Sequence, residues 1–242
     1  MIMEEMTSPE FAAGLKKTQT AILPLGSLEE HGRHLPLITD TLHMAALARA
    51  ASKQIDVFVA PAIPYGLCRS TVQHPGTVSI GFDTVRALVR DVGQSLYRQG
   101  IQRLIIATGH AGVSHQCAMI EAGEDLLASC PGLAVAVAGV VDLLRDSVAD
   151  LVSTPNDAHS GELETSIVMH LAPHLVKGTS PKEYPDFPAP ILVRNKISHW
   201  PGGVWGDPGA ASEAQGRELV ARGTNALVAL VKKVNAFEEA QD

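Results

Sequence analysis

A dense group of acidic and histidine side chains follows the first apolar run of the chain. The run at residues 21–25 (AILPL) is predicted to be a short strand that ends at Gly26. The potential ligands that come after it are Glu29, Glu30, His31, His34 and Asp40. Carboxylates and imidazoles bind divalent metals and transfer protons, and carboxylates can bridge the two metals of a hydrolase. Because binding sites in open α/β sheets lie beyond the carboxyl ends of strands, this segment predicts a metal or acid–base site.

The spacing within this group indicates which side chains could act together. In an extended segment side chains alternate, so Glu29 and His31 should point to one side and Glu30 to the other. Asp40 would rejoin the first two at the start of the following helix, and the three together could hold a divalent metal. For any one of these residues alone, a charged surface loop is the alternative interpretation.

A second candidate junction follows the buried strand predicted at residues 103–108 (RLIIAT), where Gly109 precedes His110. The carboxyl ends of parallel strands meet at one edge of a sheet, so His110 should approach Glu29, His31 and Asp40. A lone histidine after a strand can equally be structural. The coincidence of several ligand types at one edge is what favours a site.

A third junction lies in residues 156–166 (NDAHSGELETS), which place His159, Glu162 and Glu164 near the start of a helix. Acidic residues in the first turn also stabilise a helix through its dipole, without any metal. For Glu162 or Glu164 taken alone, that structural role is therefore an open alternative to metal binding.

The elements that would position these residues alternate along the chain. We predict strands at 21–25, 57–60, 103–108 and 133–138. Helices are predicted at 41–54, 82–99, 113–129, 162–171 and 211–237, and a short helical stretch should follow the last strand and end at about residue 152. Strands that alternate with helices predict an α/β fold: a three-layer α/β/α sandwich with a mostly parallel central sheet. No internal repeat or boundary is evident, so we expect a single domain over residues 1–242.

Composition narrows the class of protein. The net charge is −7, with 19 basic and 26 acidic residues and no basic patch, which argues against a nucleic-acid partner. The cysteines, Cys68, Cys117 and Cys130, form no C-x-x-C pair and are interpreted as reduced thiols. The longest apolar run, 133–141, is too short to cross a bilayer, and the N-terminus lacks a signal pattern. We expect a soluble, cytoplasmic protein with no membrane partner.

Other reaction classes lack their sequence signatures. The chain has no G-x-S-x-G, no Walker A loop, no H-E-x-x-H, and no G-x-G-x-x-G that opens a helix after a strand. Nothing in the sequence marks Cys68 or Cys117 as a nucleophile. Arg69 and Ser70 could line a pocket, although a solvated loop is the alternative for both.

Several motifs, in order, carry a family resemblance. They are residues 24–37 (PLGSLEEHGRHLPL) with Asp40-Thr41, residues 74–77 (HPGT), 108–110 (TGH), 159–166 (HSGELETS) and 203–208 (GVWGDP). Together they resemble the creatininase (creatinine amidohydrolase) family, and the resemblance covers roughly residues 20 to 230. It implies a creatininase-like fold and a dinuclear, metal-dependent amidohydrolase.

The resemblance also implies roles for individual residues. Glu29, Asp40 and His110 match the ligands of one metal, while His31 and the shared Asp40 match ligands of the other. The metals would be two divalent ions per chain, Zn²⁺, Mn²⁺ or Fe²⁺. They would activate water for attack on an amide carbonyl, and His159 would act as the acid–base that passes a proton to the leaving nitrogen.

Two departures from creatininase itself concern the second metal and the substrate. Creatininase has a metal-binding glutamate where this chain has Gly112, and many relatives with that glycine carry a glutamate at the position of Glu162. We therefore predict Glu162 as the remaining ligand of the second metal. Creatininase also has a tryptophan shortly before the histidine that matches His159, where this chain has residues 155–158 (PNDA). We expect Ser70, Ala111 and Asn156 to contact the substrate.

The substrate and assembly stay open at this point. Three kinds of substrate are compatible with the resemblance. They are a small-molecule cyclic amide such as creatinine, a formamide, and a short peptide. The family includes a peptidase that trims such a peptide, the precursor of a redox cofactor. A metal-binding protein without turnover, or a sugar-ring hydrolase that cleaves C–C bonds, is the alternative from another class. Relatives form oligomers, often hexamers, so a homo-oligomer is predicted.

Overall fold

A four-stranded parallel sheet forms the centre of the computed structural model, which describes residues 1–238 and, for residues 146–148, the backbone alone. The strands are β1 (Thr20–Leu25), β2 (Phe58–Val59), β3 (Arg103–Thr108) and β4 (Ala134–Gly139), in the order β2-β1-β3-β4. Every pairing within the sheet is parallel. The predicted single domain over residues 1–242 includes positions 239–242, which lie outside the described residues, and it stays a prediction.

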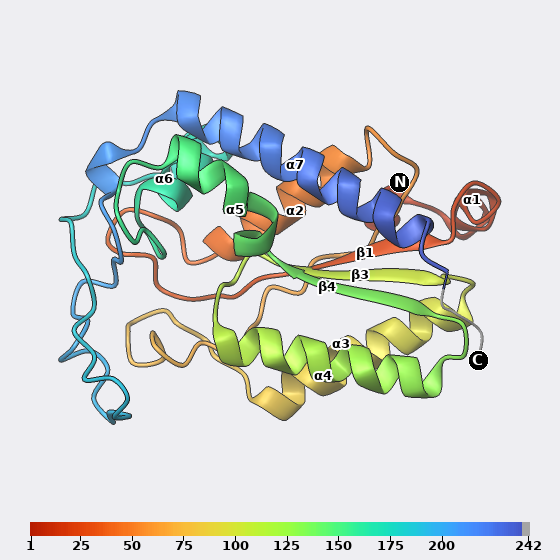
Figure 1. Ribbon diagram of the computed structural model, residues 1–242, viewed down its shortest axis with the longest axis horizontal. Helices are drawn as coiled ribbons and strands as arrows, with labels where there is room; N and C mark the ends of the chain where they lie inside the picture. The colour runs from red at the N-terminus through yellow and green to blue at the C-terminus, as the bar shows by residue number, and fades with distance from the viewer. Residues whose placement is uncertain (239–242) are drawn as a thin grey trace.

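Helices cover both faces of this sheet (Figure 1). One layer holds α3 (Phe82–Arg98) and α4 (Val113–Ser129), and the other holds α2 (Thr39–Ala51), α5 (Val140–Leu151), α6 (Glu162–Leu171) and α7 (Glu213–Asn235). The predicted three-layer α/β/α architecture is confirmed. The short helix α1 (Ser8–Gly14) and the 3₁₀ turns Met3–Glu5, Pro173–Leu175 and Pro208–Ala210 were not predicted.

Strand β3 shows how its apolar sequence creates two cores. Alternate side chains of a strand point to opposite faces, so Leu104 and Ile106 pack into the core under α3 and α4. Ile105 and Ala107 pack into the other core, against α2 and α7. All four are fully buried, which explains why the run RLIIAT lacks the polar alternation of a half-exposed strand.

The carboxyl ends of β1 and β3 lie side by side, because Leu25 pairs with Thr108. The start of α2 packs directly over this edge. A Cβ atom at Gly109 would lie 2.0 Å from the carbonyl oxygen of Asp40, so only glycine allows the close approach. This contact brings the first turn of α2 against the segments that follow both strands. None of the helices within residues 1–238 combines the length and apolar character needed to cross a bilayer.

Candidate metal centre

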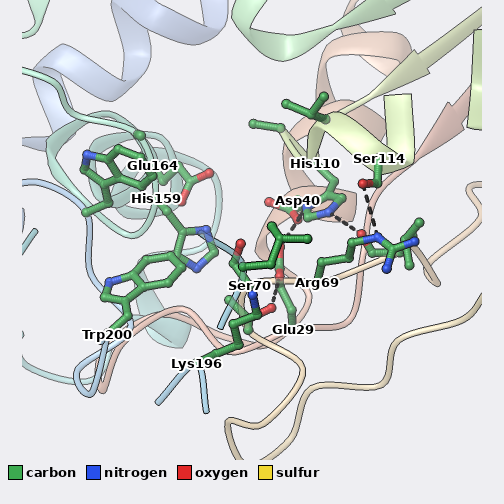
Figure 2. Close-up of a pocket in the computed structure, with 18 residues that line it drawn as sticks. Glu29, Asp40, Arg69, Ser70, His110, Ser114, His159, Glu164, Lys196 and Trp200 are labelled. Carbon is green, nitrogen blue, oxygen red and sulfur yellow. Dashed lines mark hydrogen bonds and ion pairs between the residues drawn. The ribbon is translucent and has the colours of Figure 1, made fainter. Parts of the chain in front are cut away.

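A buried cluster of carboxylates and histidines lies at the edge formed by β1 and β3. The segment after β1 supplies Glu29 and His31, the first turn of α2 supplies Asp40, and the residue pair after β3 supplies His110. These four residues are between 0% and 6% exposed. Figure 2 shows Glu29, Asp40 and His110 converging on the floor of a pocket. The predicted convergence of these residues is therefore observed.

The ring of His110 has a fixed orientation. Its Nε2 lies 3.1 Å from the carbonyl oxygen of Leu67, which can only accept a hydrogen bond, so Nε2 carries a proton. The other nitrogen, Nδ1, lies 2.7 Å from Glu29 Oε1 and 3.0 Å from Asp40 Oδ2. In the neutral imidazole, a lone pair therefore points at two carboxylate oxygens.

His31 repeats this arrangement on the other side of Asp40. Its Nδ1 donates to the carbonyl oxygen of Glu29 at 3.1 Å. Its Nε2 lies 3.1 Å from Asp40 Oδ1 and 3.5 Å from Glu164 Oε2. Histidines that bind metals commonly donate their second N–H to a carbonyl or carboxylate, which sets the tautomer. Both rings have this form.

Asp40 joins the two halves of the cluster, since one of its oxygens faces each histidine. Asp40 Oδ2 also accepts a hydrogen bond of 2.6 Å from Ser27 Oγ. Glu29 Oε1 is buried and, among the described residues, no donor meets it with hydrogen-bond geometry, although His110 Nδ1 is close. If the histidines are neutral, the three buried carboxylates of Glu29, Asp40 and Glu164 lack a compensating positive charge. The donor set therefore fits divalent cations, which would supply the missing positive charge.

The pKa values describe the same imbalance. Burial alone would lower the pKa of His31, but the charges of Asp40 and Glu164 outweigh it and raise the pKa to about 10. Burial likewise opposes protonation of His110, yet Glu29 and Asp40 raise its pKa well above the ordinary value. Burial raises the pKa of Glu164, which the nearby His31 only partly offsets. Without a cation, the cluster therefore holds protons on its histidines, and bound metals would replace them.

His159 lies beside this cluster, at the wall of the pocket. Its Nε2 donates to the carbonyl oxygen of Glu30 at 2.9 Å, and its ring packs on His31 with a centroid distance of 4.2 Å. The side chain is 14% exposed and lines the pocket, as Figure 2 shows. One ligand atom of His159 also lies within 4.8 Å of ligand atoms of Glu29 and His31. Its position is compatible with proton transfer or with a ligand role.

The cavity above the cluster has a volume of about 400 Å³. Of the predicted substrate contacts, Ser70 and Ala111 line it, whereas Asn156 does not. Asn156 is exposed and adopts a left-handed backbone with a φ of 54° in a neighbouring turn. Two cationic side chains, Arg69 and Lys196, stand at the wall of the cavity (Figure 2).

Comparison with known proteins decides the family. The sequence profile described as Creatininase, creatinine amidohydrolase, matches residues 4–231. The chain belongs to the creatininase family. The predicted family is thereby confirmed, and with it a hydrolase of the class that acts on C–N amide bonds.

Individual members of the creatininase family resemble this chain to different degrees. A mycofactocin precursor peptide peptidase from Mycolicibacterium smegmatis is 32% identical over 230 residues, covering 88% of this chain and 84% of the relative. A creatinine amidohydrolase from Pseudomonas putida is 28% identical over 190 residues, covering 71% and 72%. A solved structure described as "Creatininase Mn" shares the fold with a TM-score of 0.85 at 23% identity, covering 96% of this chain and 97% of that one.

The structure corrects one expectation for this member of the family: Glu162 does not reach the cluster. Its carboxylate faces the opposite way and accepts hydrogen bonds from the amides and hydroxyls of Ser153 and Thr154 and from the side chain of Gln215. Glu164, two residues later, lies beside His31 and Asp40 instead.

Helix geometry explains the exchange. Residues two positions apart on an α-helix are rotated by roughly 200°, so Glu162 and Glu164 cannot face the same partner. The missing side chain at Gly112 has a steric reason as well. A Cβ atom there would lie 2.4 Å from His110 Nε2, so His110 would have to shift to admit a glutamate. The carboxylate that lies beside His31 and Asp40 is that of Glu164, so it comes from α6 and not from the segment after β3.

Sequence reasoning also missed Cys68, whose sulfur lies within 4.8 Å of ligand atoms of Glu29 and His110. Burial, followed by the charge of Glu29, raises the pKa of the Cys68 thiol. Cys68 lies in the loop 61–77, two residues after a glycine and before a polar run. No other potential ligand stands near it at a spacing typical of a metal site, so the sequence contains no signal for it. The short contact between Thr71 Oγ1 and Glu29 Oε2 was equally hidden.

The other histidine and acid of the first motif hold the structure together. His34 Nδ1 and Nε2 lie 2.9 and 2.8 Å from the hydroxyls of Ser180 and Thr165, and burial lowers its pKa to about 4. Glu30 accepts a hydrogen bond of 2.9 Å from the amide of Gly32. His34 therefore connects the motif to later segments of the chain, whereas this hydrogen bond of Glu30 stays within the motif.

Proposed function

We propose that this chain hydrolyses an amide bond with two divalent metal ions. One would be held by Glu29, Asp40 and His110, and the other by His31, Asp40 and Glu164. The observation that carries the proposal is the pair of histidine tautomers, each fixed by a backbone carbonyl, that aim their free nitrogens at the two oxygens of Asp40. When bound, such ions would supply a hydroxide at neutral pH and polarise the amide carbonyl.

The chain itself would orient the substrate and move the proton. His159 lies at the cavity wall against His31, and Glu30 fixes its ring through Nε2. That leaves Nδ1 free to deliver a proton to the departing nitrogen. Trp200 packs edge-on against His159 at a centroid distance of 5.2 Å and keeps the ring in place. General acid–base help of this kind contributes about 10²- to 10⁴-fold to the rate.

Zinc, manganese and iron all suit a mixed set of carboxylate and imidazole ligands, so we propose two ions of this group without choosing among them. Metal analysis of the protein as purified, followed by reconstitution with each ion, identifies the active form. A chain that binds two ions and hydrolyses no amide would instead be a metal-binding protein without turnover.

Among amides, we favour a short peptide with a free C-terminus over creatinine. The cavity of about 400 Å³ has room for a ligand larger than a single small ring. Arg69 donates to Ser114 Oγ at 3.2 Å, and Lys196 lies over the ring of Phe187. Within the described residues neither cation forms a salt bridge with a carboxylate, so both can meet an anionic group of the substrate. The similarity to a precursor-peptide peptidase supports the same choice.

Replacing His159 with Ala tests the reaction. Turnover of an amide substrate should fall by about 10²- to 10⁴-fold while two metals per chain remain, because proton transfer is lost and the ligands are intact. Rate measurements with elemental analysis of the same samples check this result. His174→Ala, at an exposed histidine, is the matched control. Loss of metal together with activity would make His159 a ligand.

Replacing both Arg69 and Lys196 with Gln tests the substrate. The KM for a short peptide should rise by about tenfold, because each exposed ion pair contributes up to about 1 kcal/mol. The same peptide with an amidated C-terminus should show no change, since it lacks the carboxylate. Equal effects on both peptides would contradict the proposed role of these cations, whereas hydrolysis of neither by the wild type would contradict peptide cleavage.

A homo-oligomer and a cytoplasmic location stay predictions. The loop near the cavity exposes apolar side chains, Ile191 at 68% and Leu192 at 92%, which a second chain could cover. Light scattering of the metal-loaded protein measures its mass in solution.

The three cysteines are free thiols, as the sequence predicted.

A further inference from the structure

Cys68 occupies a position that a metal ligand would occupy. Its sulfur, a carboxylate oxygen of Glu29 and a ring nitrogen of His110 all lie within 4.8 Å of one another. Cys68 is 1% exposed and Glu29 is 2% exposed. Glu29 also has a buried oxygen, Oε1, that lacks a hydrogen-bond donor among the described residues. A thiol and a carboxylate with an unpaired oxygen therefore lie close together beside His110.

The backbone around Cys68 holds the thiol at this point. The carbonyl oxygen of the preceding residue, Leu67, accepts the hydrogen bond from His110 Nε2 that orients the ring. The amide of Cys68 donates to Ser79 Oγ at 2.9 Å. The position of the sulfur is thus tied to the same hydrogen bond that aims His110 at Glu29 and Asp40.

We propose that Cys68 is a fourth protein ligand of the ion held by Glu29, Asp40 and His110, an inference that rests on the proposed metal centre. As the metal–sulfur bond forms, the thiol proton passes to solvent and the cysteine binds as thiolate. The second site, with His31, Asp40 and Glu164, has nitrogen and oxygen ligands alone. The two sites of one chain then differ in chemical softness.

This difference has a consequence for metal choice. Thiolate is a soft ligand that selects zinc and similar ions, whereas carboxylate and imidazole also accept manganese. Zinc accepts carboxylate, imidazole and thiolate ligands together, and it can take a fifth ligand, which would leave a position for the water that the proposed reaction needs. The Cys68 site should therefore favour zinc or cadmium over manganese, and the Glu164 site should discriminate less.

Other cysteines of the chain provide the comparison. Cys130 is buried in the apolar core beside α3 and α4, and Cys117 is exposed on α4. Neither belongs to a group of potential ligands among the described residues. Cys117→Ser is consequently a matched control, since it removes a thiol and leaves the cluster untouched.

The test uses cobalt(II), whose bond to a thiolate gives an intense near-ultraviolet charge-transfer band that nitrogen and oxygen ligands do not give. The metal-free protein is titrated with Co²⁺ while the absorption spectrum and bound metal are recorded. We expect the band in the wild type and in Cys117→Ser, and its loss in Cys68→Ser. In competition, Cys68→Ser should also lose preference for Cd²⁺ over Mn²⁺ at one of its sites.

The outcomes separate this proposal from the proposed function. Two bound Co²⁺ ions per wild-type chain without the band would overturn the cysteine ligand and leave the two-metal hydrolase standing. Failure of the wild type to bind Co²⁺ would remove both. If Cys68→Ser does not fold, X-ray absorption of the zinc-loaded wild type decides the matter: a sulfur neighbour supports the proposal, and a shell of nitrogen and oxygen alone refutes it.

Discussion

Two glutamates in the first turn of α6 show opposite ways of burying a carboxylate. Glu162 is 2% exposed and accepts five hydrogen bonds from Ser153, Thr154 and Gln215. Glu164 is 5% exposed, accepts one from the amide of Ser160, and turns its oxygen toward His31. Burial opposes ionisation of both, but the donors lower the pKa of Glu162 to about 2, whereas the pKa of Glu164 is raised.

The difference separates an acid whose charge is satisfied by hydrogen bonds from one that is a candidate metal ligand. The hydrogen bonds of Glu162 fix the loop before α6 and tie it to α7 through Gln215. A buried charge with that many donors has no need of a cation. Glu164 shares its surroundings with Asp40 and Glu29, and these acids together lack enough positive charge unless protons or metals provide it. A poorly compensated buried acid beside other acids is the better candidate ligand.

The largest expected effect comes from the residue that both proposed sites share. Asp40→Asn should leave fewer than one metal per chain and lower amide hydrolysis by on the order of 10⁴-fold or more, because the several kcal/mol supplied by metal activation disappear. Elemental analysis and turnover measurements check both numbers. Retention of two metals would mean that Asp40 is not shared by the two proposed sites.

An intermediate effect should distinguish the two glutamates directly. Glu164→Gln should lower the metal content from two ions towards one and turnover by on the order of 10³-fold, because one ion and the several kcal/mol of charge stabilisation that it supplies would be lost. Glu162→Gln is the matched variant, and its metal content and turnover should stay near those of the wild type. Measured together by elemental analysis and kinetics, the two variants form one experiment.

The reverse pattern would change the assignment. If Glu162→Gln lost one metal and Glu164→Gln lost none, the helix would have to rotate in the metal-bound protein. Equal losses in both variants would point to a general disturbance of α6, which circular dichroism of the same samples detects.

The smallest effect concerns stability in acid. Hydrogen bonds to a charged group contribute about 1–3 kcal/mol, so Glu162→Gln should lower the free energy of unfolding by an amount in that range near pH 7. The folded pKa of Glu162 is about 2, below its ordinary value of 4.5. Its contribution is therefore complete above pH 4.5 and is lost as the pH falls towards 2.

Denaturant unfolding of wild type and Glu162→Gln across this pH range measures the contribution. The difference between the two proteins should be largest near neutral pH and should shrink in acid. Glu213→Gln, at the exposed first residue of α7, is the control for a helix-start acid. A difference that does not change with pH would show that the carboxylate charge is not what stabilises the loop.

Most secondary structure was predictable because strong local patterns carried it. The limits of β3, α4 and α6 agree with those predicted at 103–108, 113–129 and 162–171. Strand β2 is shorter than predicted, two residues in place of four, and pairs with β1 only at Ala21 and Ile22. Pro24, further along β1, has no N–H to donate to a longer ladder. Helix α1 was missed because a seven-residue amphipathic segment gives little periodicity.

Residue types and their spacing were enough to predict the kind of site and most of the residues in the cluster. Glu29, His31, Asp40 and His110 follow from residue type, alternation along an extended segment, and the rule that parallel strands end at one edge. These are local or topological properties, so they can be predicted from the amino-acid sequence. The family resemblance rested on the same residues.

Packing selects the acid of α6 that lies beside these residues and the loop that places Cys68 near His110. Glu162 and Glu164 are equally acidic and lie in the same helical turn, and the way α6 packs against α2 and α7 selects the one that faces Asp40. Cys68 reaches His110 through the hydrogen bond of Leu67, a contact between residues 43 positions apart. Helix rotation and loop path depend on packing across the whole molecule, which no local pattern encodes.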